Sequence, residues 1–271
     1  MIYTIAGFGL DVACPDGLLL PSFAPFMQPG GEARWRVTAG EGRHAAPAAR
    51  ILEQNGTDLG EVSLGLTAEG LYQATVDGRH SICFHPRRTE ASVALDCADP
   101  SADAALSAML RIAFSQWVIG QGGFAIHASA VVRDGCACLF TGPSGAGKST
   151  HAGLWLRHRP GTWLLNDDCP IIRVLPGGEV RAYGSPWSGK TPCYRPEHAP
   201  LERIERIYKA PLNRFTPLSG VEAFAELLPG CSVIHADAPL YESLCDSLAA
   251  VASAVEVGRC ECVAHSLEGL G

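Results

Sequence analysis

The stretch Ala137-Cys-Leu-Phe-Thr-Gly-Pro-Ser-Gly-Ala-Gly-Lys-Ser-Thr150 is an apolar run that breaks into a glycine-rich turn and then into the start of a helix. It satisfies the phosphate-loop pattern, Gly-x4-Gly-Lys-Ser/Thr. Glycines let consecutive backbone N–H groups curve around phosphate oxygens, and the positive end of the following helix points at the same place. We therefore predict a nucleotide-binding loop with contacts from Gly142, Pro143, Ser144, Gly145, Ala146, Gly147, Lys148, Ser149 and Thr150.

Two side chains of this loop supply the chemistry that a nucleotide needs. Lys148 brings a mobile positive charge toward the β- and γ-phosphates, and the Ser149 hydroxyl can hold Mg²⁺. We therefore expect ATP and Mg²⁺ as cofactors. The apolar residues that follow, among them Leu154 and Trp155, predict a helix that ends near Pro160-Gly161.

A second apolar stretch, Thr162–Leu165, runs into Asn166-Asp-Asp168. Phosphate-loop enzymes present a carboxylate to their metal from the end of such a strand, which is expected to lie beside the loop at the edge where ligands of α/β sheets bind. We predict that Asp167 and Asp168 supply a Mg²⁺ ligand and a base for an attacking hydroxyl. The alternative is a simple Asn-Asp-Asp turn.

Composition limits the classes of partner. The chain has 271 residues, a hydrophobic fraction of 47% and a net charge of −7. The charge argues against nucleic acid as a partner, and no apolar window is long enough for a membrane span. The N-terminus lacks the basic residues of a signal peptide, and the 11 scattered cysteines suit reduced thiols, so we expect a cytoplasmic protein. A homo-oligomer is compatible with these features.

The cysteines include two Cys-x-Cys pairs, Cys136/Cys138 and Cys260/Cys262, whose spacing places both side chains of a pair on one face of a strand. Small core residues are the simpler interpretation. Zinc bound by Cys260, Cys262 and His265 is a weaker one, because structural zinc sites have four ligands and no fourth is evident.

The patterns predict two domains, a small β-rich domain over residues 1–98 and a nucleotide-binding domain over 99–271. In the first, Leu71–Val76, Asp77-Gly78 and Arg79–His85 form a hairpin signature, because Asp-Gly accepts the positive φ of a type I′ turn. Apolar residues at helical spacing over 101–120 predict a helix that Ser101 can cap. This helix links the two predicted domains.

The strand before the phosphate loop has a neighbour that includes a histidine. Phe124–Val132 reads as one strand, joined by a tight turn at Arg133-Asp134-Gly135 to the strand that enters the loop. His127 therefore lies on a strand paired with the loop's own strand. It is either a hydrogen-bonded core residue or a group that points toward the phosphates.

A second match to the loop pattern, Gly184-Ser-Pro-Trp-Ser-Gly-Lys-Thr191, is rejected. A phosphate loop needs a helix to begin at its Lys-Thr, and Pro192 and Pro196 disfavour one. Lys190 is either a solvated loop lysine or a point charge that closes over the nucleotide. Arg214 is either a surface ion-pair partner or a contact to a transferring phosphate.

The order of His127, the Gly142–Ser149 loop and Asn166-Asp-Asp168 resembles the catalytic domain of HPr kinase/phosphorylase, a bacterial serine kinase whose fold is related to that of phosphoenolpyruvate carboxykinase. The similarity covers about residues 124–190. The regions around Phe8-Gly-Leu10 and 184–190 look more like HPr-kinase-related proteins of bacterial gene clusters, including kinases of lasso-peptide precursors. The resemblance implies an α/β fold with a phosphate-loop kinase core of this type.

The resemblance also implies roles for individual residues. Lys148 would contact ATP phosphates, Ser149 would help to hold Mg²⁺, Asp168 would deprotonate the acceptor hydroxyl and His127 would assist. We thus expect an ATP- and Mg²⁺-dependent kinase acting on a hydroxyl, serine foremost, of a peptide, protein or small molecule. The alternatives are a carboxykinase-like enzyme acting on a small acid and a non-catalytic ATP-binding switch.

Overall fold

The computed structural model describes residues 1–15, 18, 21–42, 47–263 and 267. It is a mixed α/β protein that divides into two compact units. Unit 1 comprises Met1–Gln121 and Ile234–Asp237, and unit 2 comprises Gly122–Val233 and Ala238–Gly271. The division lies after Gln121 rather than after residue 98, because the helix α1 (Ala102–Trp117) packs against the sheet of unit 1.

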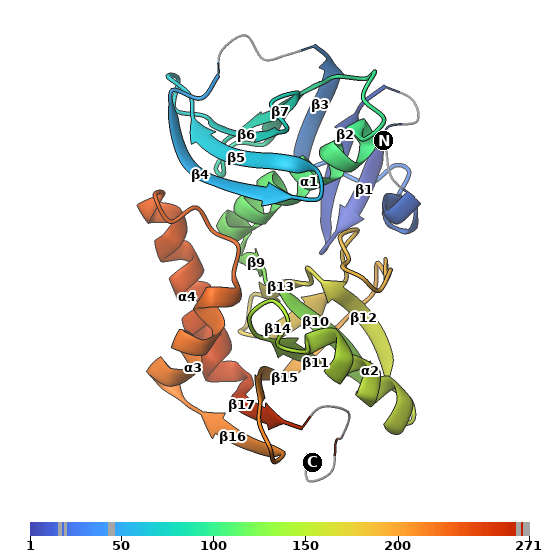
Figure 1. The fold of residues 1–271 in the computed structure, drawn as a ribbon, viewed down its shortest axis with the longest axis vertical. Helices are drawn as coiled ribbons and strands as arrows, with labels where there is room; N and C mark the ends of the chain where they lie inside the picture. Colours follow the sequence, from blue (N-terminus) through green and yellow to red (C-terminus); the bar gives the residue numbers. More distant parts are fainter. Residues whose placement is uncertain (16–17, 19–20, 43–46, 264–266, 268–271) are drawn as a thin grey trace. The chain divides into compact units, whose positions relative to one another are not determined.

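Unit 1 is built on one eight-stranded sheet with the strand order β1-β2-β3-β8-β7-β6-β5-β4 (Figure 1). Only the pairs β2–β3 and β3–β8 are parallel. The strands are β1 (Ile2–Ile5), β2 (Phe8–Ala13), β3 (Trp35–Glu41), β4 (Arg50–Thr57), β5 (Gly60–Leu66), β6 (Tyr72–Val76), β7 (His80–Phe84) and β8 (Glu90–Leu95), with a 3₁₀ helix η1 (Pro21–Phe26) after β2.

The hairpin predicted around Asp77-Gly78 is confirmed. Tyr72 lies opposite Phe84 and Val76 opposite His80, and the two turn residues have φ angles of 51° and 63°. The edge strand β4 has no counterpart in the prediction. All its residues but one are exposed, so its sequence lacks the apolar alternation by which a half-buried strand is recognised.

The helix α1 packs on β6, β7 and β8 through a nearly continuous apolar face. Trp117 stacks on Trp35 with ring centroids 5.9 Å apart. Phe8 packs edge-on against the Trp117 ring, with centroids 5.3 Å apart. The predicted side-chain cap from Ser101 is wrong. The Ser101 hydroxyl instead donates to Asp99 Oδ1 at 2.7 Å, and the Ser101 N–H donates to the same oxygen at 2.9 Å. The hydroxyl is therefore turned away from the N–H groups of the helix.

Unit 2 has the strand order β12-β10-β11-β15-β14-β13-β9, with β17 added on β15 and β16 added on β17. The long strand β15 pairs with β14 through its first residues and lies between β11 and β17, parallel to both, through the rest. The strands are β9 (Gly123–Ala125), β10 (Ala128–Arg133), β11 (Cys136–Thr141), β12 (Trp163–Asp168), β13 (Ile171–Val174), β14 (Val180–Tyr183), β15 (His198–Lys209), β16 (Arg214–Leu218) and β17 (Glu256–Cys262).

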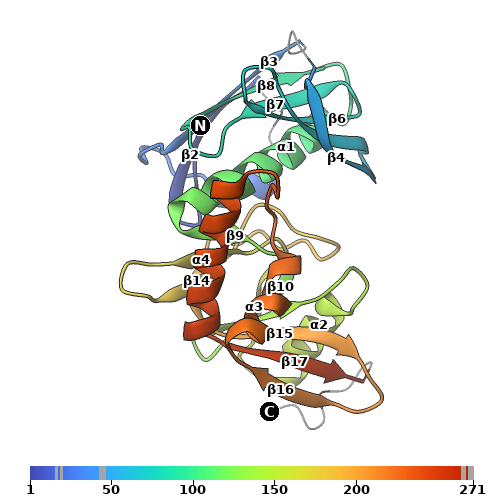
Figure 2. The same cartoon turned by 90° about the vertical axis from the view of Figure 1, so that its left-hand side faces the viewer.

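Helices lie on both faces of the parallel part of this sheet. The helices of unit 2 are α2 (Lys148–His158), α3 (Gly220–Leu227) and α4 (Ala238–Ala254), with the 3₁₀ turn η3 (Leu228–Gly230) after α3. The 3₁₀ turn η2 (Val118–Gln121) follows α1 in unit 1. Ile207 and Cys260 pack with Trp155 of α2, whereas the alternate residues Arg206 and Arg259 bind Glu226 of α3. Figures 1 and 2 show α2 and the α3–α4 pair on opposite sides of these strands.

The predicted strand over Phe124–Val132 is interrupted. β9 pairs with β13 and β10 pairs with β11 and β12, and Ile126 and His127 form the break between them. At the break, the His127 N–H donates to Gly230 O at 2.8 Å. His127 thus precedes the strand on which it was expected. Within the described part of the chain, no helix combines the length and the apolar character that crossing a membrane requires.

Candidate active site

The glycine-rich segment joins β11 to α2 by a tight turn. β11 ends at Thr141, α2 begins at Lys148, and the φ angles of Gly142, Gly145 and Gly147 are 138°, 76° and 108°. A side chain at Gly142 would also lie 3.2 Å from Ile207 O. Glycine is therefore required here for both conformation and space. The turn leads directly into the N-terminus of the 11-residue helix α2, whose first backbone N–H groups favour an anion.

Lys148 lies in the first turn of α2 and is 8% exposed. Its ammonium group donates to Gly142 O at 3.1 Å and Pro143 O at 3.2 Å. Burial lowers the pKa of Lys148, while the nearby carboxylates of Asp168 and Asp167 act in the opposite direction. The carbonyl groups of the loop thus hold the Lys148 ammonium next to the loop, where it can bind a phosphate after a change of side-chain rotamer.

The acidic residues reach the same edge of the sheet from β12. β12 is not the direct neighbour of β11, because β10 lies between them. Both pair with β10, so that Ala128 is opposite Thr141 on one side and Asp168 on the other. The loop and the two aspartates consequently flank the start of β10.

Asp168 and His127 meet at this edge. His127 Nε2 lies 3.4 Å from Asp168 Oδ1, and the two side chains are 46% and 27% exposed. Both groups can therefore be reached from solvent. A carboxylate that is accessible and in contact with an imidazole can accept a proton from a bound hydroxyl.

Asp167 points into the protein and contacts the loop through a serine. It is 3% exposed, and its Oδ1 accepts a hydrogen bond from Ser129 Oγ, which lies 3.5 Å from Ser149 Oγ. The other oxygen, Oδ2, is buried without a hydrogen-bond partner among the described residues. A buried carboxylate oxygen without a partner is costly, and a cation beside Ser149 would compensate it. Asp167 and Ser149, connected through the Ser129 hydroxyl, thus fit the oxygen ligands that Mg²⁺ prefers.

The rejected look-alike, residues 184–191, contains no helix and packs on the end of β12. The Asn166 side-chain amide, which is fully buried, donates to the carbonyl groups of Ser185 and Trp187 at 3.2 and 3.0 Å. The Gly189 N–H donates to Asp167 O, and a side chain at Gly189 would lie 2.9 Å from that oxygen. Lys190, which is exposed, follows Gly189 in the chain, so this hydrogen bond holds the backbone next to Lys190 against Asp167.

Two residues near the loop were not predicted from the sequence. Ser129 lies two residues after His127, so strand alternation could have placed it on the same face. Arg206, opposite Thr141 on β15, lowers the pKa of Lys148 by its charge, and no local signal in the sequence indicates it. Arg214 is 70% exposed and forms an ion pair with Glu261 at 2.5 Å, which agrees with its simpler interpretation.

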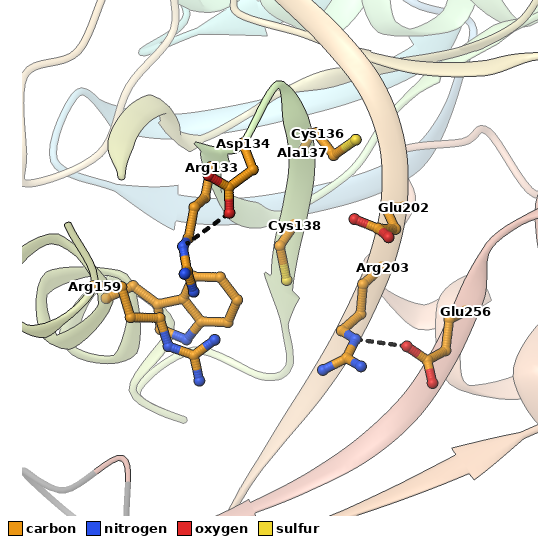
Figure 3. Close-up of a pocket in the computed structure, with 10 residues that line it drawn as sticks. Arg133, Asp134, Cys136, Ala137, Cys138, Arg159, Glu202, Arg203 and Glu256 are labelled. Atoms are coloured by element: carbon orange, nitrogen blue, oxygen red, sulfur yellow. Dashed lines mark hydrogen bonds and ion pairs between the residues drawn. The ribbon is translucent and has the colours of Figure 1, made fainter. Parts of the chain in front are cut away.

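Two cavities lie in unit 2. One, of 560 Å³, lies beside the loop and is lined by residues that include Gly145, Thr150, His151, Lys209 and Cys262. The other lies at the opposite end of β10 and β11, at the Arg133-Asp134 turn (Figure 3). Two of its three arginines have acidic partners, Arg203 with Glu256 at 2.6 Å and Arg133 with Asp134 at 3.3 Å, and Arg159 lies over the Trp155 ring. Only the first adjoins the loop residues.

No protein-family model and no curated protein sequence matches the chain. Among solved structures, the HPr(Ser) kinase/phosphatase from Coxiella burnetii aligns with a TM-score of 0.30 and 13% sequence identity, covering 53% of this chain and 87% of that chain. A likeness at this level establishes neither a shared fold nor a shared activity.

Proposed function

We propose that the protein is a phosphotransferase that uses ATP and Mg²⁺ to phosphorylate a hydroxyl group of a peptide, protein or small molecule. The observation that supports it most is the meeting of two different acidic groups at one glycine loop. Asp167 is buried and connects to Ser149 through the Ser129 hydroxyl, and Asp168 is accessible beside His127. Phosphoryl transfer needs one group of each kind, a metal ligand and a group that orients or deprotonates the acceptor.

The roles follow from burial and contact. Lys148 and the backbone N–H groups of the loop bind the phosphates and neutralise their charge. Asp168 accepts the proton of the acceptor hydroxyl, since it is the aspartate that an acceptor can reach. His127 holds the Asp168 carboxylate in place through the contact at 3.4 Å. Ser149 and Asp167 would hold Mg²⁺, which supplies charge neutralisation at the phosphates.

The cavity beside the loop is the place for the nucleoside part of ATP. It begins at Gly145 and Thr150, next to the phosphate-binding segment, and continues toward Lys209 and Val263. Its volume of 560 Å³ lies in the range of small-molecule sites, about 300–1,000 Å³. A nucleotide bound by its phosphates at the loop therefore has a hollow for its remainder.

The test is transfer from γ-labelled ATP by wild type and by Asp168→Asn, with a cell extract or peptides encoded by neighbouring genes as acceptors. We expect wild type to label an acceptor and Asp168→Asn to lower the rate by about 10²- to 10⁴-fold, because a positioned base is lost. ATP affinity should stay within about threefold, since Asp168 is not a phosphate contact in the proposal.

The control variant is Asp134→Asn, which makes the same chemical change at an 82% exposed position in the turn at the far end of β10. It should leave both transfer and ATP affinity unchanged. Equal transfer by Asp168→Asn and wild type would remove Asp168 from its role. ATP binding with no labelled acceptor and no ADP release under any condition would favour the non-catalytic switch instead.

A further inference from the structure

A cluster of possible metal ligands lies behind the phosphate loop. His151 comes from α2, and Cys260 and Cys262 come from β17, and one side-chain donor atom of each lies within 4.8 Å of the others. The three residues are 3%, 0% and 8% exposed. The two sulfur atoms are 3.1 Å apart. The cluster is separate from Asp167 and Ser149, so it is independent of the proposed Mg²⁺ site.

The elements bring these side chains together for simple reasons. Residues 260 and 262 share one face of β17 because strand side chains alternate, and this face packs against α2. His151 lies one turn after Lys148 on the buried side of α2, and its N–H donates to Gly147 O at 2.8 Å. His151 is therefore attached through the backbone to the last glycine of the loop.

A carboxylate adjoins the cluster. Glu205 of β15 is 3% exposed, and its Oε2 lies 3.8 Å from His151 Nε2, which also accepts the Trp155 indole N–H at 3.3 Å. The hydrogen bond from Cys260 lowers the pKa of Cys262 to about 6, and His151 acts in the same direction. The same hydrogen bond and burial raise the pKa of Cys260.

We infer that His151, Cys260 and Cys262 form a three-ligand zinc site, next to which the Glu205 carboxylate lies 3.8 Å from His151 Nε2. Thiolate and imidazole ligands select Zn²⁺ over Mg²⁺, which prefers oxygen. Ligands of one tetrahedral zinc lie about 3.3–3.8 Å apart, since each bond is about 2.0–2.3 Å long, so small side-chain rotations suffice. His265, the third ligand considered from the sequence, lies outside the described residues, and His151 takes that place.

The site also has an entry route and a charge balance. His151 and Cys262 line the 560 Å³ cavity beside the loop, so a metal ion can reach them. Metal binding would release the protons of the two thiols, and the bound cation would offset the thiolates that form. The Glu205 carboxylate has its own cation, Arg203, at 3.4 Å. A sulfur separation of 3.1 Å corresponds to two thiols, because a disulfide bond is about 2.05 Å long.

The test uses the full-length, reduced, metal-free protein. Titration with Co²⁺, which reports thiolate ligation by its charge-transfer absorption, should give one site per chain, and Zn²⁺ should displace it. Zn²⁺ should protect Cys260 and Cys262 from alkylation, as read by peptide mass spectrometry, while the other described cysteines react as before. This measurement needs no variant.

Removal of a residue that only supports a metal ligand costs about 10- to 100-fold in metal affinity. The double variant Cys260→Ser/Cys262→Ser removes two ligands, so its Co²⁺ affinity should fall by more than this. His151→Ala removes the third ligand and should also lower the Co²⁺ affinity. Cys97→Ser, in unit 1, is the matched control and should bind as wild type does. Three results would overturn the site: no Co²⁺ band in wild type, an unchanged band in the double variant, or a Cys260–Cys262 disulfide that persists under reducing conditions. None of these readouts depends on kinase activity.

Discussion

Lys148 is the single charge on which ATP affinity should depend most. In the structure it binds two loop carbonyl groups, and in the proposed complex it exchanges them for phosphate oxygens. A hydrogen bond to a charged group contributes about 1.5–3 kcal/mol, so Lys148→Ala should weaken ATP binding by about 10- to 150-fold, measured by calorimetry. Lys190→Ala, measured beside it, should lower affinity only if that exposed lysine closes over the nucleotide. Wild-type affinity in Lys148→Ala would contradict the assignment of the loop.

Ser129 gives a prediction of a different kind, because it contacts both proposed metal ligands and no phosphate. Its hydroxyl donates to Asp167 and lies 3.5 Å from Ser149 Oγ. Ser129→Ala should raise the Mg²⁺ concentration for half-maximal transfer by about 10- to 100-fold, as loss of an outer-shell partner does. Transfer at saturating Mg²⁺ should change little. Ser253→Ala, at an exposed position of α4, is the control, and an unaltered Mg²⁺ dependence in Ser129→Ala would refute this role.

At the scale of elements, Glu226 connects α3 to two strands. Arg206 of β15 and Arg259 of β17 bind its carboxylate at 2.8 and 2.6 Å, and the Tyr208 hydroxyl donates to it at 2.8 Å. Burial alone would raise the pKa of Glu226, but the hydrogen bonds from Tyr208 and Arg259 outweigh it and the pKa is lowered. The carboxylate therefore stabilises the fold in its charged form.

Glu226→Gln should lower the free energy of unfolding by about 1–3 kcal/mol near pH 7, because two arginines keep only a neutral partner. The folded pKa lies below the unfolded value of about 4.3, so the stabilisation is complete above that value and is lost as the pH falls through the folded pKa. The free energies of unfolding of the variant and of wild type, measured with urea at a series of pH values, should thus converge in the acidic range. Glu222→Gln, exposed on the same helix, should match wild type, and a pH-independent gap for Glu226→Gln would contradict the assigned charge.

Local patterns explain which elements could be predicted from the sequence. The Asp77-Gly78 hairpin and the turn from Thr141 to Lys148 depend on residues that determine their own backbone conformation. The pairing of β15 with β11 and β17 depends on contacts between distant segments, and so does the position of Arg206 beside the loop. His151 could not be assigned to Cys260 and Cys262 for the same reason. Sequence spacing favoured His265 because it is near them in the chain.

At the scale of the whole molecule, the chain returns to unit 1 for four residues in the middle of unit 2. Ile234–Asp237 belong to unit 1, where the Ile234 N–H donates to Gln116 Oε1 at 2.9 Å and Asp237 accepts the Tyr72 hydroxyl at 3.1 Å. Burial and the Asp237 charge raise the pKa of Tyr72 to about 12, so its hydroxyl stays a donor at physiological pH. Asp237 also pairs with Arg87 at 3.3 Å, so buried hydrogen bonds and an ion pair attach both ends of the segment to unit 1.

Gln116 is the residue that tests this. It is 3% exposed on α1, and leucine has a similar volume but no acceptor. Gln116→Leu should leave the buried Ile234 N–H unpaired at a cost of about 1–3 kcal/mol and raise amide exchange in peptides that cover 234–237, measured by mass spectrometry. Exchange in β6 and β7 should stay as in wild type if the opening is local. Gln54→Leu, the same change at an exposed position of β4, should alter neither region, whereas unchanged exchange at 234–237 in Gln116→Leu would show that other contacts hold the segment.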